Sequence, residues 1–174
     1  MKTLYLLRHA KSAWNDPSID DHDRPLAPRG ARAATLIGRH LRAEGLRPDV
    51  ILCSTARRAV DTLALVTAQL GTDRPQVPAQ HEHGLYLSGE AALLDRLRRL
   101  PDDAATVLLV AHNPDLHNLA QDLAGDGDQA DLRSLAAKFP TAALAVLTFP
   151  RDSWGDIGSR AGTLSRLILP KKLT

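Results

Sequence analysis

The sequence predicts an α/β fold of three layers, α/β/α, with a mostly parallel central sheet. Short runs of apolar residues without polar alternation are typical of strands buried on both faces of such a sheet. Longer segments with apolar residues at helical spacing separate these runs, as in successive strand–helix–strand units. The last two apolar runs follow each other without an obvious helix, which leaves open an antiparallel pairing at one edge of the sheet.

The first half of the chain predicts two strands and two helices. A polar, proline-containing loop over 15–28 separates the first strand from the first helix, and long loops in compact domains are often functional. Pro28 opens that helix and Gly45 ends it, whereas Ser54 or Thr55 caps the second. We expect strands over 3–7 and 49–53, and helices over 28–44 and from about 56 to 70.

The second half predicts shorter helices and three further strands. Ser88 is the expected cap of one helix, and Pro114 suits the start of the next. A glycine- and aspartate-rich stretch indicates a turn. The expected elements are a short strand or extended piece at 85–87, helices over 89–100, from 113 and over 131–138, a turn at 125–128, and strands over 106–111, 143–149 and 162–169.

Composition indicates an ordinary cytoplasmic domain. The 174 residues fit a single domain over 1–174, with 44% hydrophobic and 24% charged residues. A net charge of +2 argues against a nucleic acid or a membrane surface as partner. Cys53 has no second cysteine to pair with, which favours a reducing compartment, and we expect it to be a buried small hydrophobe. The apolar run 4–7 is too short for a signal peptide or a membrane span.

Histidine and arginine side chains follow the three most clearly predicted parallel strands. Arg8 and His9 come after the first, Arg57 and Arg58 shortly after the second, and His112 after the third. Because ligands of open α/β sheets bind outside the carboxyl ends of the strands, these groups should gather at one edge. Guanidinium groups bind phosphate oxygens, helix N-termini attract anions, and a neutral imidazole is a competent nucleophile near pH 7. The sequence therefore predicts phosphoryl chemistry here.

The residues around the first strand also carry a family resemblance. Residues 6–12, Leu-Leu-Arg-His-Ala-Lys-Ser, resemble the N-terminal motif of the histidine phosphatase (phosphoglycerate mutase-like) superfamily, which more commonly has Gly in place of Ala10. With Trp14 following, this form is similar to the SixA-type phosphohistidine phosphatase branch. The resemblance extends over nearly the whole chain, through residues 23–30, 54–58, 85–86, 110–114, 149–154 and 170–171.

The resemblance implies a phosphoglycerate mutase-like fold and a set of site residues. His9 would take the phosphoryl group, with Arg8, Arg57 and His112 completing the catalytic pocket. We favour Arg57 over Arg58, which we expect to be a solvated helix residue paired with a carboxylate such as Asp61. The implied substrate-binding residues at the rim are Lys11, Ser12, Asn15 and Asn113. The resemblance implies no metal or organic cofactor.

A general acid for the leaving group is not identified by any motif. Glu82, which we also place among the substrate-binding residues, and the acidic loop 20–23 are the candidates. A missing acid hinders alkyl phosphate esters most, and phosphohistidine least, because a ring already protonated at its other nitrogen leaves without help.

Three functions compete on this site. A phosphatase for protein phosphohistidine is favoured, since the short chain has no room for large insertions over the pocket. A phosphatase for a small phosphorylated metabolite would use the same pocket. A non-catalytic module that binds phosphorylated partners is the third, although it would not need an intact His9. His81 and His83 flank Glu82 without an evident third ligand, so we expect no metal site.

Overall fold

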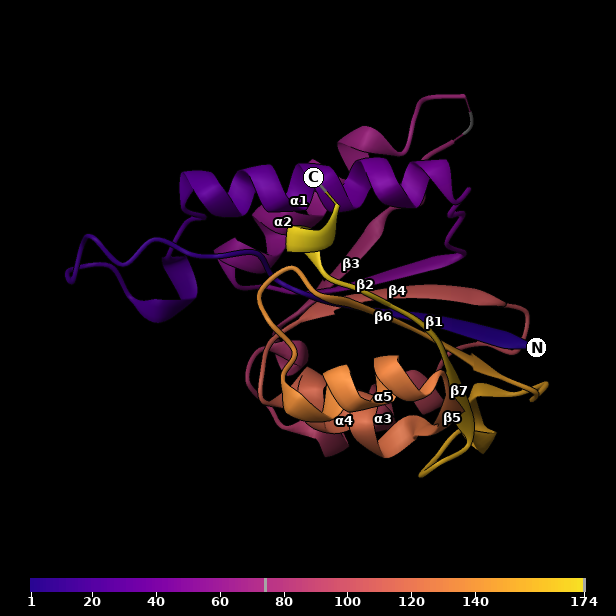
Figure 1. Cartoon of the computed structure of the whole chain (residues 1–174). Coiled ribbons are helices and arrows are strands. Elements are labelled where there is room, and N and C mark those ends of the chain that lie inside the picture. Colours follow the sequence, from indigo (N-terminus) through magenta and orange to yellow (C-terminus); the bar gives the residue numbers. More distant parts are fainter. Residues whose placement is uncertain (74, 174) are drawn as a thin grey trace.

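The computed structural model describes residues 1–73 and 75–173 of the chain. In this part, seven strands form one central sheet: β1 (Lys2–Arg8), β2 (Val50–Ser54), β3 (Ala79–Glu82), β4 (Thr106–Ala111), β5 (Ala124–Gly127), β6 (Leu144–Phe149) and β7 (Gly162–Ile168). The helices are α1 (Pro28–Ala43), α2 (Arg57–Gln69), α3 (Glu90–Arg98), α4 (Asp115–Leu123) and α5 (Gln129–Ala137). Figure 1 shows α1 and α2 on one face of the sheet and α3, α4 and α5 on the other. The predicted three-layer α/β/α fold is confirmed.

The strand order is β3-β2-β4-β1-β6-β7-β5, and most neighbouring strands are parallel. β4 pairs in parallel with β1 and β2, β2 with β3, and β5 with β7. β6 runs antiparallel to both of its neighbours, β1 and β7. Both antiparallel pairings involve β6, and no α-helix separates β6 from β7 along the chain.

Alternate residues of the central strands enter two separate apolar cores. Leu4 and Leu6 pack in the core under α3, α4 and α5, whereas Tyr5 and Leu7 pack in the core under α1 and α2. Both faces of β1 are thus covered, which explains why its sequence is continuously apolar. Cys53 is fully buried, and burial raises the pKa of its thiol to about 12, so it stays protonated as expected of a packing residue.

Two expected elements are wrong. Strand β3 was not predicted, and residues 83–85 form a 3-10 helix where a short strand or extended piece at 85–87 was expected. The expected turn at 125–128 is largely the edge strand β5. A Cβ added at Gly125 would lie 2.0 Å from the carbonyl oxygen of Arg160, so this glycine permits close backbone approach and does not mark a turn.

The expected helix caps also differ. Ala56 is the N-cap of α2 and Gly89 is the N-cap of α3, and neither end has a side-chain cap. The hydroxyl groups of Ser54 and Thr55 instead contact histidines. No helix in the described part of the chain is long and apolar enough to cross a membrane.

Candidate functional site

The carboxyl ends of β1, β2 and β4 bring two histidines together. Arg8 stands opposite Ala111 in the parallel register, so His9 and His112 both follow at the same edge of the sheet. The backbone N–H of His9 donates to the carbonyl of Ala111 at 3.1 Å. The two imidazole centroids lie 5.1 Å apart, close enough for both rings to reach one phosphoryl group.

His9 is held as a neutral ring with one free nitrogen. Its side chain is buried, and Nδ1 lies 2.7 Å from the carbonyl oxygen of Ala10. A carbonyl oxygen can only accept, so Nδ1 carries the proton and Nε2 keeps its lone pair. Burial lowers the pKa of His9 to about 4; the bond to Ala10 opposes this, and the charges of Arg58, Arg8 and Arg24 add to it. His9 is therefore uncharged and nucleophilic at Nε2 near pH 7.

His112 presents a hydrogen-bond donor toward the same region. Its Nε2 lies 2.7 Å from Ser54 Oγ, which already accepts from the N–H of Ala56 at 3.2 Å. When the Ser54 hydroxyl donates its proton to Nε2, the neutral ring carries its own proton on Nδ1. That Nδ1 is buried and has no partner among the described residues. Burial, followed by the charges of His9, Arg58 and Arg8, lowers the pKa of His112 to about 3, although Asp21 opposes the shift.

Arg8 and Asn113 share one anchor, the carbonyl oxygen of Phe139. Arg8 Nη1 donates to it at 3.1 Å and Asn113 Nδ2 at 2.8 Å. Phe139 is buried in the core under α4 and α5, so this anchor is rigid. Burial, followed by repulsion from the charged guanidinium of Arg58, lowers the pKa of Arg8. An anion bound between them would relieve this repulsion.

The structure places Arg58, and not Arg57, in the pocket. The Arg57 side chain is 58% exposed and lies 3.4 Å from Asp61, one helical turn on. The Arg58 side chain is 4% exposed, and its guanidinium carbon lies 5.8 Å from the centre of the Tyr86 ring, which packs against His112. The prediction that favoured Arg57 is wrong because the buried face of α2 begins at Arg58 and recurs at Thr62.

Asp21 of the long loop fixes Arg58. Its carboxylate accepts from Arg58 Nη2 at 3.0 Å, from Arg24 Nη2 at 2.8 Å and from the Tyr86 hydroxyl at 2.5 Å. Burial raises the pKa of Asp21, but hydrogen bonds from these three side chains lower it more. The pKa of this carboxyl group is therefore well below its usual range. The Tyr86 ring lies 5.4 Å from the His112 ring. The sequence does not predict this role of Tyr86, because a Leu-Tyr pair alone carries little information.

Two of the carboxyl groups considered as general acids are not free to donate a proton. Asp21, in the loop 20–23, is held ionised by its three donors. Glu82 accepts from Arg96 Nε at 2.7 Å and from Arg96 Nη2 at 3.0 Å, so both of its oxygens are occupied. A carboxylate in a bidentate arginine pair is a poor general acid.

The remaining predicted rim residues occupy different environments. Ser12 is buried and accepts from Arg24 Nη1, so it supports the long loop. Lys11 is exposed and lines a neighbouring groove. Asn15 is exposed on the loop, next to Trp14, which is 73% exposed with the Arg24 guanidinium 3.4 Å from its ring centre. Within the described residues, no group of three or more His, Cys, Asp or Glu side chains could hold a metal ion.

We expect Asp21→Asn to lower kcat/KM by roughly tenfold to a hundredfold, because a displaced Arg58 no longer meets the phosphoryl oxygens. Binding of vanadate, a phosphoryl mimic, should weaken in parallel, whereas the thermal unfolding midpoint should change little, since the Asp21 side chain is 44% exposed. Steady-state kinetics and vanadate titration check this. Asp20→Asn, an exposed neighbour, is the control. Equal losses in the two variants would contradict a positioning role for Asp21.

We expect the free energy of unfolding to fall as the pH is lowered from 6.5 toward about 4. In this window the unfolded chain binds a proton at His9 that the folded protein does not, so acidification favours unfolding. His9 alone contributes roughly 3 kcal/mol across the window. Urea unfolding at several pH values measures it, and His9→Gln should show a shallower dependence. Identical slopes for the two proteins would contradict the lowered pKa.

Comparison with known proteins gives consistent matches. The sequence model of the histidine phosphatase superfamily (branch 1) matches residues 4–86. An uncharacterised protein of Mycobacterium tuberculosis (strain ATCC 25618 / H37Rv) is 40% identical over 167 residues, which cover 95% of this chain and 100% of that protein. A SixA protein of Nakamurella multipartitia, provisionally assigned as a phosphohistidine phosphatase, is 31% identical with a TM-score of 0.83, covering 97% of this chain and 96% of that one. A similarly assigned SixA protein of Agrobacterium tumefaciens is 28% identical with a TM-score of 0.81, and the match covers 97% of this chain and 98% of that one.

Proposed function

Because the chain belongs to the histidine phosphatase superfamily, and within it to the SixA-type branch, we propose that it hydrolyses protein phosphohistidine through a phosphoryl intermediate on His9. The observation that carries this proposal is the state of His9. Its ring is buried and neutral, its Nδ1 proton is committed to Ala10, and His112 lies beside it. Nε2 is therefore left as a nucleophile.

In the first step, Nε2 of His9 forms a bond to phosphorus while the phosphorus–nitrogen bond of the substrate breaks. Arg8, Arg58 and the Nδ1 proton of His112 stabilise the charge on the phosphoryl oxygens. The substrate imidazole keeps the proton on its other nitrogen and leaves as a neutral ring. In the second step, water attacks phosphorus and inorganic phosphate is released. His9 then leaves as a neutral ring too, since its Nδ1 proton stays on the bond to Ala10.

The substrate class follows from the leaving group. An alkyl phosphate ester releases an alkoxide, which needs a proton donor. Asp21 is engaged by Tyr86, Arg24 and Arg58, and Glu82 by Arg96, so neither of these carboxyl groups supplies that proton. Phosphohistidine needs no such donor in either step. The assignment of SixA relatives as phosphohistidine phosphatases supports the same choice.

A substrate panel tests the proposal. We expect kcat/KM to be highest for a peptide phosphorylated on histidine, lower for p-nitrophenyl phosphate, and much lower for sugar phosphates, in the order of leaving-group quality. Efficient hydrolysis of one sugar or nucleotide phosphate would favour the metabolite phosphatase instead. Binding of the phosphopeptide without release of phosphate would favour a non-catalytic module.

A further inference from the structure

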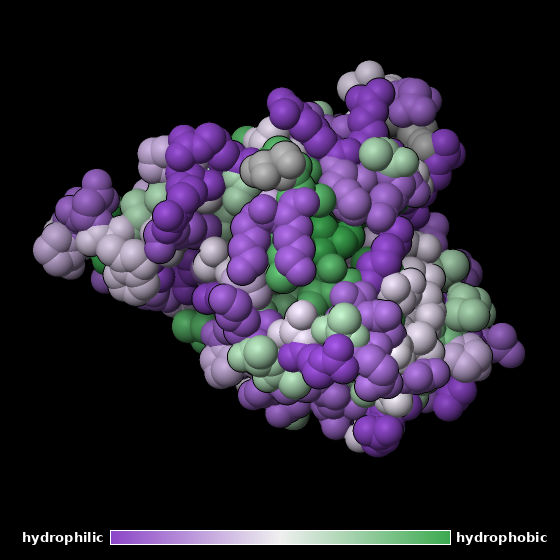
Figure 2. Space-filling model, viewed as in Figure 1, coloured by the Kyte–Doolittle hydropathy of each residue, from purple (hydrophilic) through white to green (hydrophobic). Residues whose placement is uncertain are grey.

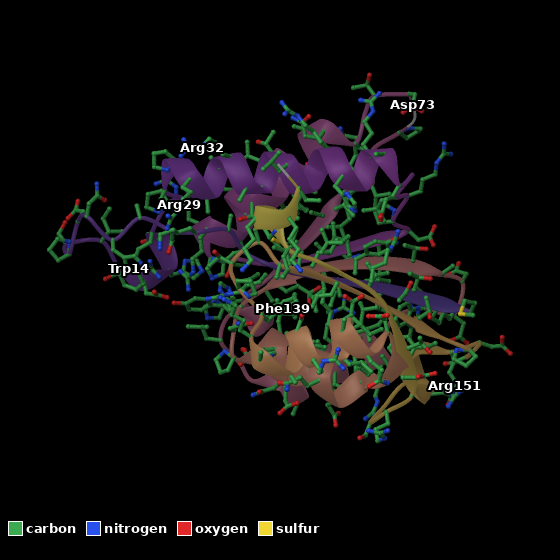
Figure 3. The ribbon with its side chains drawn as sticks, in the orientation of Figure 1. Trp14, Arg29, Arg32, Asp73, Phe139 and Arg151 are labelled. Atoms are coloured by element: carbon green, nitrogen blue, oxygen red, sulfur yellow. The ribbon has the colours of Figure 1, made fainter. Side chains whose placement is uncertain are left out.

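A second hollow lies next to the candidate site, between the start of α1, the segment 140–141 and the C-terminal segment 169–171. Its volume is about 560 Å³, and we call it the basic groove. Figure 2 shows strongly hydrophilic residues over the start of α1 and over the C-terminal segment, with less hydrophilic residues in the hollow between them. Arg29 and Arg32 are labelled at the start of α1 in Figure 3.

All charged residues that line the basic groove are cationic, namely Lys11, Arg29, Arg32 and Lys171. None of the four lies within 4.0 Å of a carboxylate in the part of the chain that the structure describes. The whole chain has a net charge of only +2, so this is a local concentration of positive charge. Such a concentration attracts anionic partners and speeds their association.

The groove is rigidly joined to the segments that carry the site. The carbonyl oxygen of Lys11, two residues after His9, accepts from the N–H of Ala27 at 2.9 Å. A Cβ added at Gly30 would lie 2.1 Å from that same oxygen, so α1 starts in direct contact with this segment. On the other side, the N–H of Ala142 donates to the carbonyl of His9 at 3.0 Å, next to the groove residue Thr141. The groove therefore lies beside the chain segments that flank His9, within reach of a protein bound at the site.

The lining identifies the class of occupant. Besides the cations, the groove presents apolar side chains, including Leu36, Pro140 and Leu169. A sugar phosphate has little apolar surface to place there, and no aromatic residue lines the groove to stack a base. An acidic polypeptide with apolar side chains satisfies both features, because it offers carboxylates to the rim and apolar groups to the floor.

We propose that the basic groove docks an acidic, partly apolar segment of the protein that carries the phosphohistidine. This inference rests on the proposed function for the identity of the partner. The groove adds affinity for the protein around the phosphohistidine, while the pocket at His9 recognises the phosphoryl group itself. Docking then lowers KM for acidic protein substrates and leaves the chemistry on free phosphohistidine unchanged.

Direct binding tests the groove without catalysis. The probe is a fluorescent peptide of Glu and Leu residues around one unphosphorylated histidine, and its counterpart has Lys in place of Glu. We expect the full chain to bind the Glu peptide more tightly, with an affinity that falls as salt is added. Arg29→Glu/Arg32→Glu should weaken this binding about tenfold, whereas Arg39→Glu/Arg133→Glu, which makes the same charge change at exposed sites outside the groove, should not.

Kinetics then separates docking from chemistry. With the Glu peptide phosphorylated on its histidine, the groove variant should raise KM about tenfold at unchanged kcat, and hydrolysis of free phosphohistidine should stay at the wild-type rate. Equal effects of the groove and control variants, or equal binding of the Lys peptide, would overturn the docking proposal. The proposal would also be overturned if an oligonucleotide bound as tightly as the Glu peptide and lost as much affinity in the groove variant. If the wild-type chain did not hydrolyse phosphohistidine at all, the proposed function would be refuted, whatever the peptide-binding experiment showed.

Discussion

His9→Ala is expected to abolish turnover and the covalent intermediate together. The Nε2 atom of His9 is the nucleophile in our proposal, and alanine leaves no atom to accept the phosphoryl group. Rapid quenching of the wild-type chain during turnover should trap phosphate that is labile in acid and stable in alkali, as expected of a phosphorus–nitrogen bond. The variant should trap none, and its hydrolysis rate should fall by several orders of magnitude.

His81→Ala is the matched control for this experiment. His81 is an exposed histidine on β3, outside the proposed pocket, so its removal should leave both the rate and the trapped phosphate unchanged. Circular dichroism and the thermal unfolding midpoint show whether His9→Ala keeps the fold. A folded His9→Ala protein that still hydrolysed the substrate at the wild-type rate would mean that another group is the nucleophile.

Arg58→Ala is expected to lower kcat/KM by roughly 150-fold, which corresponds to about 3 kcal/mol of lost transition-state stabilisation. Arg58 is buried next to the two histidines, where a guanidinium acts through a medium of low dielectric constant. Arg57→Ala removes an exposed side chain paired with Asp61 and should change kcat/KM little. Steady-state kinetics of the two variants on one substrate show which of the two neighbouring arginines acts in the pocket.

Arg58→Lys tests whether the loss of activity in Arg58→Ala is caused by unfolding. Lysine keeps the positive charge near Asp21 but lacks the planar fork that binds two oxygens at once. We expect it to fold with a thermal midpoint close to wild type and still to lose much of kcat/KM. If Arg57→Ala caused the larger loss and Arg58→Lys none, the assignment of Arg58 to the pocket would have to be abandoned.

The proposed mechanism uses neither Asp21 nor Glu82 as a general acid. Asp21 serves as an anchor for Arg58, and Glu82 pairs with Arg96 of α3. Both were candidates on residue type alone, because the sequence shows where carboxylates occur along the chain but not which cations they meet. Arg96, which pairs with Glu82, lies 14 residues further along the chain, in helix α3.

The sequence by itself determined the layered α/β fold and the meeting of His9 with His112. Apolar runs such as 106–111 are strong signals of strands covered on both faces, and parallel strands bring their carboxyl ends to one edge. Those two facts depend only on local pattern and on topology, so they can be read without coordinates.

The tertiary structure alone decided which arginine faces the pocket, which carboxylates are free, and where the basic groove lies. Arg57 and Arg58 are equivalent as residue types, and only the packing of α2 against β2 and the loop of Asp21 buries one and exposes the other. The groove likewise combines segments near residues 11, 29, 140 and 171. Such outcomes depend on contacts between distant parts of the chain, which residue type and spacing do not specify.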